Sequence, residues 1–531
     1  MKNSSQLTGR ETSGQMTDPE IPDGWVNTTI GVVADLSPPK PSQKALPPSA
    51  SVTFVPMPAV DAEMGAIVSP KTRAFASVRK GYSSFAENDI IFAKITPCME
   101  NGKVAIARNL SNGLGFGSTE FLVLRSKGAI LPEYLFYYLR QEWFRRTAEA
   151  EMTGSVGQRR VPAGFLRNAP LPLAPEAEQK RIVAKAEELL ARVNATKERL
   201  AKVTVILKRF RQAVLAAAYS GQLTAEWRDN QKQLTDVEQW IRDIFRLRQE
   251  FPRKENGLLK NYTPPNDNDF PPPPKGWTVA SSDVLFSFVT SGSRGWAKYY
   301  ADSGSIFIRI ANLDHNSIHL TLSDIQHVTP PSGAERNRTR VQPGDILISI
   351  TADVGMTALV PDEFGEAYVN QHVAIARPIQ GVYKPYLAWY LASSGGQAQF
   401  QDLQRGATKI GLGLDDIKSL VIPFPPLEEQ QEIVRRVEAL FKLADSIEKR
   451  VTRGTARAES LTQAILAKAF RGELVPPEAE LARREGRSYE PASALLARIK
   501  AELAEKGTNL KPAGRSALKS HPKKVLTKSI N

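Results

Sequence analysis

Two stretches of the chain decide its fold: Leu171–Val193, LPLAPEAEQKRIVAKAEELLARV, and Ile422–Ala444, IPFPPLEEQQEIVRRVEALFKLA. They align without a gap, with Glu178-Gln179 on Glu429-Gln430, and the alignment continues until Leu223 falls on Leu474. Chance similarity between two helices would not keep one register over roughly fifty residues. The chain therefore contains an internal repeat.

Each copy of the repeat predicts one long helix with an apolar face. Apolar residues alternate four and three positions apart over five heptads, which is typical of coiled-coil packing. Pro175 and Gly221 bound the first helix at roughly 40 residues, or about 60 Å. The residues expected in the two seams are Ile182, Leu189, Val193, Leu200, Leu207 and Phe210, and Ile433, Val437, Leu440, Ile447, Leu461 and Ile465.

The natural partner for each seam is the other seam of the same chain. Because each helix follows its own globular domain, the pattern favours an antiparallel pair with pseudo-two-fold symmetry. The alternative is two amphipathic helices buried in separate cores. Gly454 interrupts the second seam and should weaken it by up to about 1 kcal/mol relative to alanine.

The repeat extends upstream of the helices. Pro22, Gly24 and Trp25 match Pro274, Gly276 and Trp277, and Tyr134-Leu135 matches Tyr386-Leu387. Between these points the two halves diverge, although both contain a turn leading into an apolar strand. Constant ends around variable middles predict one scaffold that carries two different surfaces.

These patterns predict an α+β protein with two domains of mixed α/β character, each followed by a long helix. Four successive prolines, Pro271 to Pro274, indicate an extended spacer before the second domain. The expected segments are a disordered N-terminus (1–20), domain 1 (21–174), a central spacer helix (175–221), a linker with a short helix and a Pro-rich part (222–273), domain 2 (274–425), a distal spacer helix (426–474), a helical extension (475–505) and a basic disordered tail (506–531).

Composition narrows the class of protein. The formal net charge of +14 makes nucleic acid a plausible partner, but half of it comes from the tail 506–531, which contains seven basic residues and no acid. The single cysteine, Cys98, excludes a disulfide framework and a cysteine-built zinc site. A polar N-terminus and the lack of a long apolar run indicate a soluble protein, and we expect it in the cytoplasm.

The helices carry phrases that resemble the specificity subunit of type I restriction-modification systems, most closely its K-type (type IA-like) class. The phrases are Leu207-KRFRQAVL, Gly221-QLTAEWR, Glu432-IVRRVEALF and Leu461-TQAILAKAFRGEL. The resemblance covers 21–474 and implies two target-recognition domains, each reading one half of an asymmetric, split site in double-stranded DNA. It also implies two adenine-N6 methyltransferase subunits and two ATP-dependent restriction subunits as partners, which use S-adenosylmethionine, ATP and Mg, while this chain binds no cofactor.

No catalytic motif contradicts a binding role. The chain has no Asp-Pro-Pro-Tyr or Asn-Pro-Pro-Phe tetrapeptide, no GxxxxGK[ST] and no HExxH. His315, His319 and His327 lie close together but lack an acidic constellation, so we expect no metal site. Two alternatives remain open: a stand-alone architectural DNA binder, and a self-sufficient restriction-methylation enzyme, which methyl transfer by the chain alone would reveal.

Base edges are read by Arg, Lys, Asn, Gln, Ser and Thr, and such residues gather in a few loops of both halves. The loop Thr153-GSVGQRR is the best single candidate, because it is glycine-rich and basic and is matched by Arg405-GATK. The residues predicted to contact DNA are Lys94, Thr96, Asn101, Lys103, Ser155, Gln158, Arg159 and Arg160 in domain 1, and Arg309, Asn312, Ser349, Thr351, Gln371, Arg405 and Lys409 in domain 2.

Overall fold

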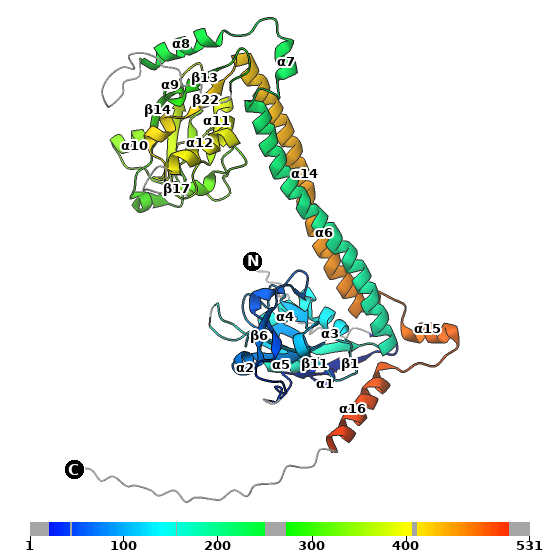
Figure 1. Ribbon diagram of the computed structural model, residues 1–531. Coiled ribbons are helices and arrows are strands. Elements are labelled where there is room, and N and C mark those ends of the chain that lie inside the picture. Colours follow the sequence, from blue (N-terminus) through cyan, green and yellow to red (C-terminus); the bar gives the residue numbers. More distant parts are fainter. Residues whose placement is uncertain (1–20, 43–44, 156, 250–271, 406–410, 509–531) are drawn as a thin grey trace, which may run out of the picture. The chain divides into compact units, whose positions relative to one another are not determined.

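The structure of the chain, a computed structural model, describes residues 21–42, 45–155, 157–249, 272–405 and 411–508 (Figure 1). The predicted N-terminus 1–20, most of the basic tail and of the Pro-rich spacer, and Lys409 lie outside the described residues. Contacts divide the chain into two units, one formed by 1–198 with 455–531 and the other by 199–454. The second unit is continuous in sequence, whereas the first combines both ends of the chain.

The domain of the first unit is closed at its base by an antiparallel pair, β1 (Val26–Thr29) with β12 (Pro170–Leu173). Two four-stranded sheets lie between them in sequence. Sheet A has the order β2 (Ala34–Leu36), β11 (Phe121–Ser126), β8 (Ile90–Ala93), β9 (Val104–Ile106). Sheet B has the order β6 (Lys71–Ala74), β3 (Ser51–Val55), β10 (Leu114–Gly117), β7 (Ser83–Ala86), and a hairpin joins β4 (Val60–Asp61) to β5 (Ala66–Ile67).

Helices complete the first unit. Those described in the domain are α1 (Ile30–Val33), α2 (Phe75–Val78), α3 (Pro132–Leu139), α4 (Glu142–Ala150) and α5 (Ala163–Asn168). After Phe470 come α15 (Glu478–Glu485) and α16 (Ala492–Thr508). Ala492 and Leu495 of α16 are buried in the same core as Trp25 and Tyr134, so the C-terminal extension is part of this domain's core.

The domain of the second unit repeats this plan. Its base is β13 (Thr278–Ser281) paired antiparallel with β22 (Val421–Phe424). One sheet has the order β14 (Phe286–Ser291), β21 (Val373–Pro378), β18 (Ile346–Ser349), β19 (Thr357–Leu359), and the other β15 (Tyr300–Ala301), β17 (Gln326–Val328), β16 (Ser305–Ile308), β20 (Ala367–Val369). Its helices are α7 (Ala225–Asp229), α8 (Val237–Gln249), α9 (Ser282–Leu285), α10 (Ala334–Thr339), α11 (Lys384–Ala392), α12 (Ser394–Arg405) and α13 (Leu414–Lys418).

The two domains share one sheet and differ in the other. Sheet A and its counterpart β14-β21-β18-β19 have the same order and are antiparallel throughout. In sheet B the parallel pair is central, β3 with β10, whereas in the second domain it lies at an edge, β16 with β20. The shared sheet is the constant scaffold, and the other sheet carries the divergence that the sequence predicts.

The two long helices, α6 (Glu176–Tyr219) and α14 (Leu427–Phe470), pack together within each unit (Figure 1). In the first unit Val193 packs with Ala458 and Ile465. In the second, Arg211 Nη2 donates to Asp445 Oδ1 at 2.6 Å and Glu448 Oε2 at 2.8 Å. Pairs formed early in one helix and late in the other make the packing antiparallel, as predicted.

One predicted seam residue lies elsewhere. Leu461 is 50% exposed, whereas Ala458 and Ile465 are buried. A straight helix drifts by about 20° per heptad relative to a strict seven-residue repeat. The buried face therefore passes from Ala458 through the half-buried Thr462 to Ile465, and leaves Leu461 on the outer side.

Both units contain the same buried junction between the domain base and the start of a long helix. Trp25 Nε1 donates to Glu178 Oε1, and Trp277 Nε1 donates to Glu429 Oε2, each at 2.9 Å. Both carboxylates are fully buried. Only Glu429 has a bidentate cation, Arg228, and burial raises the pKa of Glu178.

Candidate nucleic-acid interface

In the first domain the two predicted loops meet at the end of β8. The amide of Thr96 donates to the carbonyl of Arg159 at 3.0 Å, and the amide of Val161 to that of Lys94 at 2.8 Å. The loop Thr153–Arg160 is thereby fixed at both ends, with a bridge from Thr153 to Arg160. Side chains far apart in the sequence are brought onto one edge of the domain.

Three polar side chains of this edge are exposed to solvent and can be reached by a partner. Ser155 and Gln158 are both exposed on the loop, and Asn101 is exposed on the turn that follows β8. An amide such as that of Gln158 has the donor and acceptor pattern that matches an adenine edge. These three residues remain predicted base contacts of the first domain, and two of them belong to the loop that the sequence favours most.

The basic residues of the same edge are held by carboxylates. Arg160 Nε and Nη2 donate to Glu120 at 3.0 and 2.9 Å, and Lys94 Nζ lies 3.9 Å from Glu120. These cations keep the pKa of Glu120 below its usual range. Arg159 lies 3.7 Å from Glu149. The guanidinium group of Arg160 is thus oriented before any partner binds, which suits contacts of fixed geometry.

Two predicted residues use their functional groups inside the domain. Lys103 Nζ donates to the carbonyls of Met57 and Val60 at 3.1 and 2.8 Å. Thr96 Oγ1 donates to Glu100 Oε1 at 2.7 Å. Both side chains therefore help to shape the turn after β8. A contact with a base remains a prediction for the third N–H of Lys103 and for the lone pairs of the Thr96 hydroxyl.

The second domain builds the corresponding edge at the end of β18. The amide of Leu412 donates to the carbonyl of Ile350 at 2.8 Å, as Val161 does to Lys94. Thr351 and Gln371 both contact the ring of His372, Gln371 Nε2 at 2.8 Å from His372 Nε2. Because β16 and β20 are parallel, Arg309 and Gln371 follow strands that end at the same edge.

The remaining predicted residues of this domain differ in accessibility. Asn312 is buried and donates to the carbonyls of Thr321 and Asp324, and Ser349 is fully buried and donates to the carbonyl of Asp353 at 2.6 Å. Arg309 donates to Asp324 Oδ2 at 3.0 Å. Arg405 ends α12, while Lys409 lies outside the described residues.

The histidine cluster is taken up by other contacts. His315 Nε2 lies 2.8 Å from Asp353 Oδ1, and His327 Nδ1 lies 3.1 Å from the carbonyl of Gly304. Within the described ranges no group of three or more His, Cys, Asp or Glu side chains has the arrangement of a metal site. None of the helices described is both long and apolar enough to cross a membrane.

Sequence reasoning missed the acidic side chains that orient these edges. Glu120 joins Lys94 and Arg160, and Glu100 accepts from Thr96 while its second oxygen is buried without a partner among the described residues. It also missed Arg140 and Arg145, which line a cavity beside Asn101. An isolated acid or arginine gives no periodic signal, so only the structure reveals them.

A duplicated scaffold with two different polar edges defines a recognition protein with two reading domains. The comparisons with known proteins agree with this class. The family model "Type I restriction modification DNA specificity domain" matches residues 22–205 and 298–453. The chain therefore belongs to the family of type I restriction-modification specificity subunits, which are the non-catalytic, DNA-specifying components of these enzymes.

Relatives match over most of their length. The EcoBI specificity subunit of Escherichia coli is 34% identical over 67% of this chain and 69% of its own, and the EcoKI specificity subunit of strain K12 is 31% identical over 72% and 75%. A solved structure titled for the complex assembly and conformational transition of the type I R-M system has a TM-score of 0.63 and 24% identity. It covers 86% of this chain and 99% of its own, and shows the same fold.

Proposed function

We propose that the two domains, 21–174 and 274–425, each read one half of an asymmetric bipartite DNA site. The observation that carries this proposal is the pair of matched edges, at the ends of β8 and β18, built on one scaffold from different side chains. Ser155 and Gln158 lie at the first edge, and Thr351 and Gln371 lie at the second. Different donors and acceptors specify different bases.

The chain is part of a type I restriction-modification complex that acts on DNA. We propose two methyltransferase subunits docked on the long helices, with two restriction subunits joining that core. Exposed apolar side chains on the helices support such docking: Val205 and Ile206 of α6 are 53% and 61% exposed, and Leu443 of α14 is 54% exposed. S-adenosylmethionine, ATP and Mg would be held by those partners, and the product would be N6-methyladenine.

Replacing residues 22–170 with the corresponding domain of another specificity subunit tests the modular reading. Methylated adenines are then mapped across a host genome by single-molecule sequencing. We expect one half-site to change and the other to stay the same, because the second domain is a separate unit. A change in both half-sites would contradict the proposal.

Two alanine variants, each of which removes one glutamine amide from one domain, test the assigned edges more directly. Gln158→Ala should relax discrimination at one position of the first half-site by about 1–3 kcal/mol, and Gln371→Ala should do the same in the second. Binding of the methyltransferase complex is measured on duplexes with a single substituted base pair. If either variant affects the other half-site, or both affect all sequences equally, the assigned edges are wrong.

A further inference from the structure

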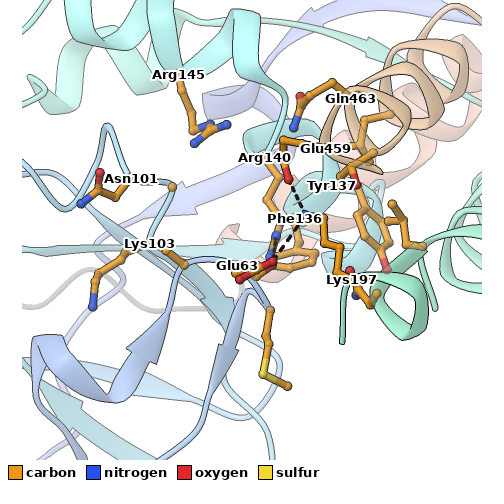
Figure 2. A pocket seen from close by; sticks show the side chains of 17 residues that line it. Glu63, Asn101, Lys103, Phe136, Tyr137, Arg140, Arg145, Lys197, Glu459 and Gln463 are labelled. Carbon is orange, nitrogen blue, oxygen red and sulfur yellow. Dashed lines mark hydrogen bonds and ion pairs between the residues drawn. The ribbon is translucent and has the colours of Figure 1, made fainter. Parts of the chain in front are cut away.

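A cavity of about 470 Å³ lies between the first domain and the ends of the long helices that belong to its unit (Figure 2). The domain contributes Arg140, at the end of α3, and Arg145 of α4, while α6 contributes Lys197 and α14 contributes Glu459. None of the predicted DNA contacts explains this cavity, although Asn101 and Lys103 lie on its wall.

The cavity carries an excess of positive charge. Its lining has four cationic side chains and two acidic ones. Both acids are taken by one cation, because Lys197 pairs with Glu459 and lies 3.5 Å from Glu63. Lys103 donates to two backbone carbonyls. Among the described residues, Arg140 and Arg145 form no ion pair with a carboxylate.

Arg140 and Arg145 both donate to backbone carbonyls, and the guanidinium of Arg140 also lies over the ring of Phe136, with Cζ 5.3 Å from its centroid. Arg140 Nη2 donates to the carbonyl of Glu63 at 2.6 Å, and Arg145 Nη1 donates to that of Glu100 at 3.2 Å. The Nε of Arg145 is buried and has no hydrogen-bond partner among the described residues. Burial lowers the pKa of Arg140, and the nearby charge of Arg145 acts in the same direction. The carboxylates of Glu459 and Asp61 raise the pKa of Arg140, in the opposite direction, but among the described residues neither forms an ion pair with it.

The second unit supplies an internal comparison at the same place of the scaffold. By the repeat, Arg140 and Arg145 correspond to Ala392 and Gln397. The correspondence is also spatial, since Arg145 lies against Gly102 and Gln397 against Gly355, both with positive φ. Gln397 Nε2 is satisfied by the carbonyls of Gly355 and Leu391 at 2.7 and 2.9 Å. The second unit thus has neither arginine here.

The two units also differ in whether this position of the scaffold is open or filled. Tyr137 and Leu190, which line the cavity, correspond to Trp389 and Phe441. In the second unit these two rings are buried and pack edge to face, with centroids 4.9 Å apart. One copy of the scaffold closes this position with aromatic packing, and the other leaves it open and lines it with unneutralised arginines.

We infer that this cavity is a binding site for a phosphate group, held between the guanidinium groups of Arg140 and Arg145. A guanidinium fork matches the geometry of phosphate oxygens, and charge-assisted bonds of this kind are strong in partly desolvated sites. The phosphate can come from the DNA backbone beside the first half-site or from a free phosphate compound. The DNA source rests on the proposed function, and the free source does not.

The test uses the chain in complex with its methyltransferase partner. Arg145→Gln introduces the residue that the second unit carries at this position, so the scaffold tolerates it there. The matched control is Arg146→Gln, which removes the same charge from the next position of α4, where the side chain is 76% exposed and outside the cavity. A second variant, the filling variant Tyr137→Trp with Leu190→Phe, introduces the two rings that close this position in the second unit and leaves the charge unchanged.

Two measurements distinguish the sources. For DNA, the slope of log K against log salt should fall by about 0.9 in Arg145→Gln and not in Arg146→Gln, with base preference unchanged. For a free ligand, inorganic phosphate should bind the DNA-free complex saturably by phosphorus NMR, and the charge and filling variants should both abolish this. A changed slope identifies the backbone, and saturable binding with an unchanged slope identifies a free phosphate compound.

If wild type neither binds inorganic phosphate nor differs from Arg145→Gln in its salt slope, the inference is overturned. The inference stays testable if one variant fails to fold. Titration of the wild-type complex with inorganic phosphate tests binding of a free phosphate compound, and the filling variant provides a second measurement of the salt slope for DNA. A complex that binds all DNA sequences equally would refute the proposed function instead, and would leave the slope comparison intact.

Discussion

Replacing Arg228 with methionine tests the ion pair of the buried junction in the second unit, and also removes a hydrogen bond to the carbonyl of Gly221. Glu429 is fully buried and accepts from Arg228 Nε at 2.9 and 3.1 Å, with Nη2 at 2.8 Å. Trp277 and Thr224 supply the only other side-chain donors described for it, at 2.9 and 2.7 Å. Methionine keeps much of the side-chain volume and removes the charge. The carboxylate is then left buried with two neutral donors.

Removing one partner of a buried ion pair costs about 3–5 kcal/mol, and the two remaining donors place this variant near 3 kcal/mol. That value is a roughly 150-fold increase in the local opening equilibrium. Hydrogen exchange followed by mass spectrometry on peptides containing Thr224–Asp229 and Trp277–Ser281 measures it directly. Adding Glu429→Gln to Arg228→Met should recover more than about 1 kcal/mol, because the uncompensated charge disappears.

The first unit provides the control. Arg181 pairs with Glu478, but it is 31% exposed and Glu478 keeps a second partner, Arg487. Arg181→Met should therefore cost less than about 1 kcal/mol. If Arg228→Met raises exchange by less than tenfold, or by no more than Arg181→Met does, the junction is not held by its ion pair and the reasoning fails.

Three further perturbations follow from the packing and charges of single residues. Gly454→Ala should stabilise the second unit by about 0.5 kcal/mol in urea unfolding, because alanine has the higher helix propensity. The new methyl group would lie 3.2 Å from Leu200 Cδ1, so Leu200 must shift slightly. A loss of stability would show that Leu200 cannot move. Glu366→Gln should lower stability at pH 7 by no more than about 1 kcal/mol, since the site is partly exposed. Arg336, Tyr368 and Ser305 hold the pKa of Glu366 at about 2, so the difference in stability from wild type should shrink as pH falls from 4.5 towards 2. A difference that stays constant with pH would refute the ion pair. Deleting residues 476–508 should destabilise the first unit by about 3 kcal/mol or more through loss of Ala492 and Leu495 from its core, and leave exchange in the second unit unchanged.

The features that could be predicted are those with a local or repeated signal. Apolar periodicity predicts the helices α6 and α14, and the internal repeat, in which Glu178 aligns with Glu429, predicts that they pair. The prediction failed at Leu461, where helical drift accumulates over several heptads. Periodicity describes one helix at a time, and the buried face of a pair also depends on how the two axes run.

Contacts between distant segments had no such signal. Lys103 was predicted to contact DNA because it is basic and follows a strand, but the carbonyls that bind it belong to Met57 and Val60. Arg140 ends an apolar helix, which in sequence is typical of an ordinary helix end. Its significance depends on α6 and α14 closing a cavity over it. Pairing of β3 with β10, roughly sixty residues apart, is equally invisible to local patterns.

One unit is continuous in sequence and the other combines two distant segments, and this arrangement explains how two unlike domains share one scaffold. Residues 199–454 run continuously from the end of α6 through the second domain to the start of α14, whereas the first unit needs the start of α6, the end of α14 and the helices after it. In both units the turn at the end of a long helix meets the base of a domain: Gly221 approaches Pro274, and Gly472 approaches Pro22, and the matching glycines share a φ of 73°. Each domain is thus bounded by three equivalent parts: the end of one long helix, the start of the other, and its own pair of base strands. Because these constant parts carry the packing that both units share, the exposed side chains on the loops beyond β8 and β18, such as Ser155 and Gln158, can differ between the domains.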